Sequence, residues 1–247
     1  MARERLDILL VQRGLAESRS RAQARVLAGD VVVDDHRVDK PGTQVNVDAA
    51  IRLKGEGLRW VSRGGLKLEA ALAAWPVPVE GAVCVDVGAS TGGFTDVLLE
   101  RGAVRVFAVD VGRGQLHEKL RQDPRVTSLE KTHIKTLARG ALDPPPRVAV
   151  VDVSFISLQQ VLPALVGHLA PVADIVALVK PQFEVGRAQV GKGGIVRDGQ
   201  AREKAVDDVV TAALGLSLIH AGTIASPIEG ADGNVEFLAW FRRDAGG

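Results

Sequence analysis

The stretch VDVGASTGGFTD, residues 85–96, decides the fold. An apolar run, AVCV (82–85), leads into a glycine-rich turn, and the amphipathic pattern FTDVLLERG (94–102) follows at once. This order predicts a strand, a tight loop and a helix. Glycines let the backbone bend sharply and approach a ligand closely. The N–H groups of such a loop and of the helix start favour negatively charged or oxygen-rich ligand groups.

A second apolar run, RVFAVD (105–110), ends on Asp110. An acid that follows the glycine loop at the end of the next strand can accept hydrogen bonds from both hydroxyls of a ribose. The loop and the acid together predict a nucleoside-containing cofactor.

The loop GASTGG (88–93) departs from the dinucleotide pattern G-x-G-x-x-G, because it lacks the middle glycine that makes room for a pyrophosphate. S-adenosylmethionine has a ribose and no pyrophosphate, so the departure favours it over a dinucleotide or a purely structural glycine turn. No Lys-Ser or Lys-Thr follows the glycines, which excludes a phosphate loop. The expected cofactor contacts are Asp86, Gly88, Ala89, Ser90, Thr91, Gly92, Gly93, Phe94, Asp110 and Val111, with core packing as the alternative for Phe94.

The composition favours a soluble cytoplasmic protein. The 247 residues suffice for a large and a small domain, and 46% hydrophobic residues support a substantial core. The single cysteine, Cys84, excludes a disulfide within the chain, and no metal site is expected. The N-terminus does not resemble a secretory signal, and no run approaches the ~18 apolar residues of a membrane helix. No feature specifies an oligomeric state.

The net charge of +1 conceals a basic N-terminus, since the first 27 residues carry six arginines against three acids. A local basic face can bind phosphates even on a nearly neutral molecule. An ordinary solvated helix face is the alternative. Helical spacing over 5–14 and 18–29, then short apolar runs at 31–33, 45–47 and 51–53, predict a small α+β module.

The text RLDILLVQRGLAESRSRAQARVLAGDVVVDDHRV (5–38) resembles the RNA-binding S4 domain, first known from a small-subunit ribosomal protein. In that family an arginine-rich helix face binds structured RNA. The resemblance implies phosphate contacts, which supply salt-sensitive affinity without reading sequence. They fall on Arg5, Arg19, Arg21 and Arg25.

Beyond this module we expect a linker over 55–64 and a second domain over 65–247, the module itself spanning 1–54. Trp60 either pins one domain to the other or belongs to a core. Apolar strands then alternate with amphipathic helices, which predicts an α/β fold with a parallel sheet covered on both faces. Strands are expected to end at Asp86, Asp110, Asp152 and Lys180.

Ligands of such sheets bind at the carboxyl ends of the strands. Asp152 and Lys180 lie there, and Glu236 joins them if the last strand, 234–243, runs antiparallel. Lys67 lies on the helix before the first strand of the domain. Each residue alone also fits an ordinary surface charge, but their shared edge makes Lys67, Asp152, Lys180 and Glu236 a candidate catalytic set.

This set resembles the Lys-Asp-Lys-Glu tetrad of the FtsJ/RrmJ ribose 2′-O-methyltransferases. The surrounding text is similar to the TlyA (hemolysin A) family over nearly the whole chain, through VSRGGLKLEAAL, VDVGASTGGFTDVLL, VDVSFISL, LVKPQFEVG and GNVEFL. The resemblance implies a Rossmann-like, seven-stranded methyltransferase domain that uses S-adenosylmethionine, with Asp152 also touching the methyl donor. It implies 2′-O-methylation of a cytidine ribose in ribosomal RNA of the large subunit, and leaves open whether the small subunit is also a substrate. A catalytically inert RNA-binding or ribosome-assembly factor and a cytolysin are the alternatives.

The chemistry suits these residue types, because a 2′-hydroxyl must lose its proton as it attacks. We assign Lys180 as the base and Lys67 as the positive neighbour that steadies the developing alkoxide, with both acids orienting them. A second lysine and desolvation favour a neutral amine, whereas carboxylates favour the ammonium, so the sequence leaves this balance open. The loop 181–197 either orders around RNA or is a flexible connection. Exposed RNA contacts are expected at Arg63, Arg187 and Lys192, with Glu184 and Arg197 as further exposed candidates.

Overall fold

The computed structural model describes residues 3–34, 36–53, 59–230 and 233–245, without the side chains of Arg52 and Ala188. The chain forms two compact units, Met1–Arg59 and Trp60–Gly247. The division falls within the expected linker 55–64, of which residues 55–58 lie outside the described residues. The exact domain limits stay a prediction.

The first unit packs two helices against short strands. Helix α1 spans Leu6–Gln12 and α2 spans Arg19–Ala28, with Ser18 as the N-cap of α2 and Gly29 (φ 76°) ending it. Strand β1 (Arg3–Arg5) pairs with β4 (Gln44–Asn46), and β2 (Val31–Val33) lies between β3 (His36–Arg37) and β5 (Ile51–Leu53). The apolar stripes of both helices and β2 form one core. Both helices are as predicted. Strands β1 and β3 were not predicted, because they are polar and carry no apolar pattern.

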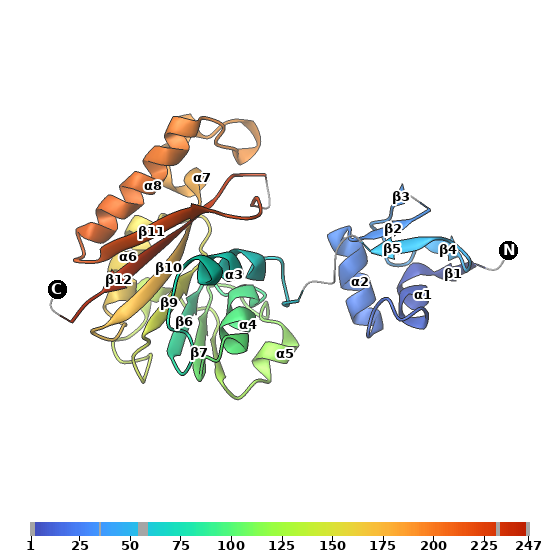
Figure 1. Cartoon of the computed structure of the whole chain (residues 1–247), viewed down its shortest axis with the longest axis horizontal. Helices are drawn as coiled ribbons and strands as arrows, with labels where there is room; N and C mark the ends of the chain where they lie inside the picture. Colours follow the sequence, from blue (N-terminus) through green and yellow to red (C-terminus); the bar gives the residue numbers. More distant parts are fainter. Residues whose placement is uncertain (1–2, 35, 54–58, 231–232, 246–247) are drawn as a thin grey trace. The chain divides into compact units, whose positions relative to one another are not determined.

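The second unit is built on a seven-stranded sheet in the order β11-β12-β10-β9-β6-β7-β8 (Figure 1). Its strands are β6 (Val83–Val87), β7 (Arg105–Val109), β8 (Val126–Leu129), β9 (Val148–Val151), β10 (Ala173–Val179), β11 (Ile219–Ala225) and β12 (Phe237–Arg243). Strands β6 to β10 pair in parallel, whereas β12 runs antiparallel to both β10 and β11. The predicted α/β, seven-stranded architecture is confirmed.

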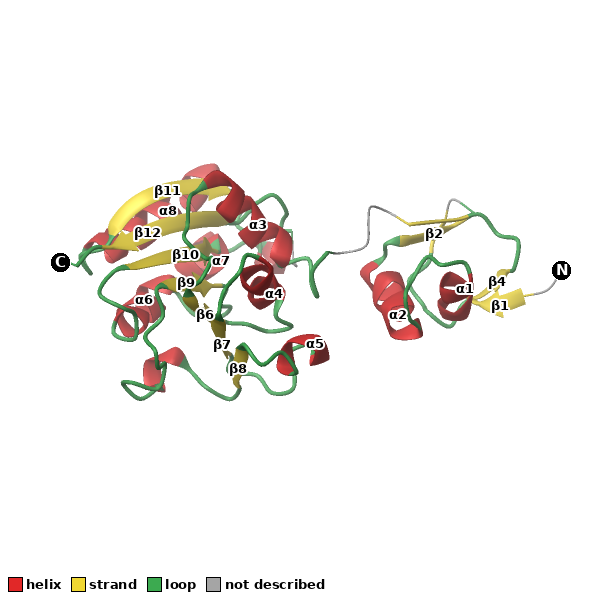
Figure 2. Ribbon diagram, turned by 60° about the horizontal axis from the view of Figure 1, so that its bottom comes forward, coloured by secondary structure: helices red, strands yellow, loops and turns green. Residues whose placement is uncertain are grey.

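Helices cover both faces of this sheet (Figure 2). Alternate residues of each strand point to opposite faces, so Cys84 packs beneath α3 (Gly65–Ala74) and α4 (Gly93–Glu100), and Val85 packs with α6 (Leu158–Val166) and α8 (Gly199–Leu214). Short helices α5 (Glu118–Arg121), α7 (Pro181–Glu184), η1 (Ile134–Thr136), η2 (Arg187–Gln189) and η3 (Lys192–Gly194) complete the unit. Among the described residues, no helix has the length and apolarity that crossing a bilayer requires.

The segment before α3 packs with the second unit. Trp60 is buried in the core beneath α3 and α4, and its indole N–H donates to Glu100 at 2.8 Å. The backbone N–H of Val61 donates to the carboxylate of Asp96 at 2.9 Å. Trp60 therefore belongs to a core, one of the two roles considered for it, and residues 60–64 lead directly into α3 and Lys67.

Candidate active site

Two lysine–carboxylate pairs contain the four predicted catalytic residues. The Nζ of Lys67, on α3, lies 2.5 Å from Oε2 of Glu236, and both side chains are buried. The Nζ of Lys180 lies 2.6 Å from Oδ1 of Asp152 and donates a 3.0 Å hydrogen bond to Oγ of Ser154. The contact with Asp152 is an ion pair without the alignment of a hydrogen bond. Each lysine thus has its own carboxylate.

Strand register places both pairs at one edge of the sheet. Val179 on β10 lies opposite Phe237 on β12, so the adjoining residues Lys180 and Glu236 stand at neighbouring strand ends. Val87 on β6 lies opposite Val151 on β9, which puts the start of the glycine loop beside Asp152. This is the carboxyl edge of the parallel strands, where open α/β sheets bind their ligands.

Gly88 begins the loop with φ +86°, a conformation that side chains with a Cβ rarely adopt. A Cβ at this position would lie 2.2 Å from the backbone carbonyl oxygen of Asp152. The loop therefore approaches the end of β9 so closely that no side chain fits at residue 88. A small hollow beside it is lined by Ser62, Gly64, Gly88, Ala89, Ser90, Thr91, Gly93, Phe94 and Asp152.

We expect Gly88→Ala to lower cofactor affinity at least about tenfold, because the loop must move away from Asp152 to admit the methyl group. The same displacement and the positive φ should cost about 2–4 kcal/mol of unfolding free energy. Gly81→Ala is the matched control, since Gly81 also has positive φ (+68°) but its Cβ would meet open space. Calorimetric titration with S-adenosylmethionine checks the affinity, and equal affinities for the two variants would contradict the expectation.

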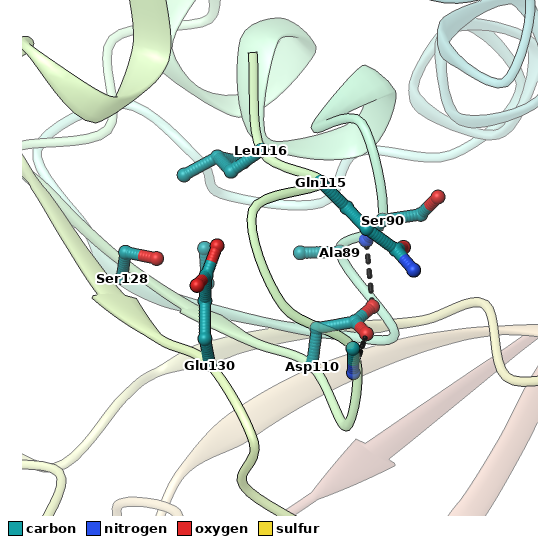
Figure 3. A pocket seen from close by; sticks show the side chains of 9 residues that line it. Ala89, Ser90, Asp110, Gln115, Leu116, Ser128 and Glu130 are labelled. Carbon is teal, nitrogen blue, oxygen red and sulfur yellow. Dashed lines mark hydrogen bonds between the residues drawn. The ribbon is translucent and has the colours of Figure 1, made fainter. Parts of the chain in front are cut away.

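Asp110 organises the ribose end of the predicted cofactor site (Figure 3). Its Oδ2 accepts from the backbone N–H of Ser90 at 2.7 Å, and its Oδ1 accepts from that of Gly112 at 2.6 Å. A carboxylate has about four lone-pair positions, so both oxygens retain capacity for ribose hydroxyls. Figure 3 shows Gln115, Ser128 and Glu130 with Asp110 around a second small hollow, and the Glu130 carboxylate accepts from Gly114 N–H at 2.8 Å. These three residues were not identified from the sequence.

A larger cavity of about 580 Å³ continues from Asp110 to Asp152. This volume lies within the range of small-molecule and cofactor sites. The walls combine apolar side chains with polar groups at the two ends, as a cofactor with a base, a ribose and an amino-acid tail requires. The lining residues are Val87, Gly88, Ser90, Val109, Asp110, Val111, Gln115, Thr132, His133, Ile134, Asp152, Val153, Ser154, Phe155, Ile156, Gln160 and Val161. Within the described ranges, no group of three or more His, Cys, Asp or Glu residues could hold a metal ion.

The predicted cofactor residues differ in where they lie. Val111 is exposed at the cavity, whereas Phe94 is buried in the core and also borders the hollow at the glycine loop. Asp86 is fully buried and lines neither space; its Oδ2 accepts from Thr95 Oγ1 at 2.7 Å. Its Oδ1 has no hydrogen-bond partner among the described residues. Burial, reinforced by the charge of Asp152, raises the pKa of Asp86 to about 7.

This shift predicts a pH dependence of stability. An aspartate pKa near 7 in the folded state exceeds its ordinary value of 3.8, so the folded protein binds the proton more tightly than the unfolded chain. The resulting stabilisation is complete below pH 3.8 and is lost as pH rises to about 7. Between these limits, stability should fall with rising pH less steeply in Asp86→Asn than in the wild type. Urea unfolding of both proteins across this window checks the difference, and parallel curves would contradict it.

Phe155 is the most exposed aromatic side chain at the cavity. It is 92% exposed, adopts φ +64°, and its ring centroid lies 5.2 Å from that of Phe183. A left-handed conformation is unfavourable for a bulky residue and is typical of functional sites. An aromatic residue near Asp152 and Ser154 is evident from the sequence, but no sequence pattern marks it as exposed.

The segment 181–197, expected to be a loop, contains α7, η2 and η3. The prediction that Glu184 is exposed is wrong: its carboxylate accepts from Ser157 Oγ at 2.6 Å and from Leu158 N–H at 2.8 Å, at the start of α6. Burial raises the pKa of Glu184. Arg187, Lys192 and Arg197 are exposed.

Asn234 holds this segment beside Glu236. The Asn234 side chain is buried, accepts from Val196 N–H at 3.0 Å and donates to the carbonyl of Gly194 at 2.9 Å. Hydrogen bonds of Asn234 therefore connect the segment that carries the exposed basic side chains around Lys192 to the residues just before Glu236, a predicted catalytic acid. Arg63, the remaining basic candidate of this unit, is exposed just before α3.

In the first unit, the four arginines expected to contact RNA are at least partly exposed. Arg5 and Arg19 both pair with Asp7, at 3.0 and 2.9 Å. Arg21 and Arg25 lie on α2, within one and two turns of Arg19.

The sheet order, the nucleoside-sized cavity and the paired lysines at one edge define a Rossmann-like methyltransferase. Residues 60–243 match the FtsJ-like methyltransferase family and residues 4–51 match the S4 domain. The 16S/23S rRNA (cytidine-2′-O)-methyltransferase TlyA of Mycobacterium tuberculosis is 50% identical over 241 residues, covering 97% of this chain and 90% of its own. Hemolysin A of Brachyspira hyodysenteriae is 42% identical, covering 96% and 99%.

A solved structure from Streptococcus thermophilus, provisionally described as a hemolysin, matches with a TM-score of 0.77 and 48% identity, covering 99% of this chain and 90% of its own. The chain belongs to the TlyA (hemolysin A) family, which combines an S4 domain with an FtsJ-like methyltransferase domain.

Proposed function

We propose that this chain transfers the methyl group of S-adenosylmethionine to the 2′-oxygen of a cytidine ribose in ribosomal RNA. The observation that carries the proposal is the pair of lysine–carboxylate contacts at the sheet edge beside a cofactor-sized cavity. The name of the M. tuberculosis relative supports both the nucleoside and the RNA, with 23S and 16S RNA as substrates. We propose the cytoplasm as the compartment of this activity, because ribosomal RNA is the proposed substrate.

S-adenosylmethionine fits the residues present. Asp110 would hold the ribose hydroxyls, and the loop N–H groups of 88–93 would face the amino-acid tail. Asp152 lines both the cavity and the glycine-loop hollow, so it is the residue that can contact the cofactor and Lys180 together. Asp86, on β6, links the strand before the loop to α4 after it by accepting a hydrogen bond from Thr95. When bound, the cofactor supplies an electrophilic methyl group on a sulfonium.

The chain's own residues would prepare the hydroxyl. Lys180, in its neutral form, accepts the 2′-hydroxyl proton, while Asp152 and Ser154 hold its Nζ in place. The Lys67 ammonium, fixed by Glu236, lies at the same edge and stabilises the developing alkoxide. Fixing hydroxyl and methyl in line could supply up to about 7–11 kcal/mol of the barrier reduction.

Phe155 and the basic segment would present the nucleotide. The bases of single-stranded RNA loops can stack on aromatic side chains, and an exposed aromatic ring offers a surface worth about 1–3 kcal/mol per stacked base. Phe155 lines the cavity next to Ser154 and is exposed. Arg63, Arg187 and Lys192 are proposed phosphate contacts, together with Arg5, Arg19, Arg21 and Arg25 of the first unit.

Transfer of labelled methyl groups to purified ribosomal subunits tests the proposal. We expect label in ribosomal RNA, dependent on this chain and on S-adenosylmethionine. Binding of the subunits without transfer would instead support an inert assembly factor. Leakage of liposomes exposed to the purified chain, without RNA labelling, would support a cytolysin.

A further inference from the structure

Asp7 is a fully buried carboxylate in the first unit, at the first turn of α1. Its backbone N–H donates to the carbonyl of Pro41 at 3.0 Å, which fixes the residue in the fold. Burying an isolated charge is costly, so a buried carboxylate requires partners that satisfy it. Among the described residues, the carboxylate of Asp7 finds its side-chain partners just before α1 and on α2.

The carboxylate binds three side chains. Arg5 donates from Nε and Nη2 to the two oxygens of Asp7, each at 3.0 Å, in a bidentate pair. Arg19 donates from Nε at 2.9 Å and Gln23 from its amide at 2.8 Å, both to Oδ2. These hydrogen bonds, that of Arg5 first, hold the pKa of Asp7 well below its usual range. The carboxylate is therefore charged at neutral pH.

The two guanidinium groups remain available to a ligand. The side chains of Arg5 and Arg19 are 39% and 54% exposed, respectively. Asp7 engages only the Nε–H of Arg19, and the Nη groups of Arg19 make no hydrogen bond to the described residues. A guanidinium has five N–H donors in a rigid fork, so one edge can be held by a carboxylate while another binds phosphate.

We infer that Asp7 is a positioning residue for RNA binding, which holds the guanidinium groups of Arg5 and Arg19 side by side as a preformed site for backbone phosphates. This rests on the proposed function, in which the first unit binds ribosomal RNA. A preformed arrangement avoids the ordering cost of two flexible side chains when the RNA binds.

The effect of charge alone on RNA binding is opposite to the effect expected from positioning. Removing a negative charge beside two arginines increases the local positive potential, which should strengthen phosphate binding. If Asp7 positions the arginines, its removal should weaken binding even though the net positive charge rises. The direction of the change therefore separates positioning from simple electrostatics.

The test compares Asp7→Asn with Glu17→Gln in the full chain. Glu17 is exposed, adjoins the N-cap Ser18 of α2, and its substitution removes the same unit of charge. We expect Asp7→Asn to bind large ribosomal subunits about tenfold more weakly than the wild type, from the ordering cost of two arginines, and Glu17→Gln to bind equally or more tightly. The Nε–H resonances of Arg5 and Arg19 should lose their protection in Asp7→Asn, while binding of S-adenosylmethionine stays unchanged.

Equal or tighter subunit binding by Asp7→Asn would overturn the inference. Failure of the wild type to bind the subunits would instead overturn the proposed function. If hydrogen exchange shows that Asp7→Asn unfolds α1 and α2, Gln23→Ala decides, because it removes one partner of Asp7 without changing any charge. Loosened Arg5 and Arg19 resonances with about twofold weaker binding in Gln23→Ala would support positioning, and unaltered resonances and affinity would overturn it.

Discussion

Lys180→Met should lower the rate of methyl transfer at least about 10³-fold, within the range expected for loss of a general base. Methionine approximates the length of lysine but has no amine to accept the 2′-hydroxyl proton. Binding of S-adenosylmethionine and of ribosomal subunits should persist, because Lys180 does not itself line the cavity and is not one of the proposed phosphate contacts. The effect therefore falls on kcat, and only weakly on KM.

Single-turnover transfer to ribosomal subunits measures this loss. Lys204→Met is the matched control: Lys204 also pairs with an acid, Asp208 at 2.7 Å, but on the exposed surface of α8. The control should retain the wild-type rate. A Lys180→Met protein that keeps a tenth or more of the wild-type rate would refute the assignment of Lys180 as the base.

Lys67→Met should destabilise the second unit by about 3–5 kcal/mol as well as abolish transfer. Glu236 is 3% exposed and its Oε2 lies 2.5 Å from Lys67 Nζ, so losing the lysine leaves a carboxylate buried without its counter-ion. Breaking a buried pair costs this much mainly because the remaining charge is uncompensated. Denaturant unfolding of wild type and variant gives the difference.

The double variant Lys67→Met with Glu236→Gln separates stability from catalysis. A neutral amide of the same shape removes the uncompensated charge, so at least half of the lost stability should return. Transfer should stay abolished, since the double variant lacks both the positive neighbour of the alkoxide and the acid that fixes it. A single variant as stable as the wild type, or a double variant that regains activity, would show that the pair has a different role.

The fold of the second unit could be predicted because apolar strands and amphipathic helices alternate along the chain, and each strand end carries a polar residue. This pattern predicts that Asp110, Asp152 and Lys180 lie at one edge of the sheet, which the strand register confirms. Glu236 lies at this edge if its strand runs antiparallel, and β12 does run antiparallel to β10.

What the sequence could not show were contacts between distant segments. Glu184 reads as a charged loop residue, but its partners Ser157 and Leu158 lie on another helix. Phe155 adopts a left-handed backbone conformation that its local sequence does not predict, and its exposure was therefore not foreseen. Likewise, the pairing of Asp7 with Arg19 requires α1 and α2 to be packed together.

The position of the transferred methyl group tests the central claim most directly. Ribosomal RNA methylated by the purified chain is digested to nucleosides and analysed by mass spectrometry. The arrangement around Lys180 and Lys67 predicts a methyl group on a ribose 2′-oxygen, and the proposed function predicts that the nucleoside is cytidine. This 2′-O-methylcytidine should be absent when Lys180→Met is used. A methyl group on a nucleobase, or on a nucleoside other than cytidine, would contradict the assignment.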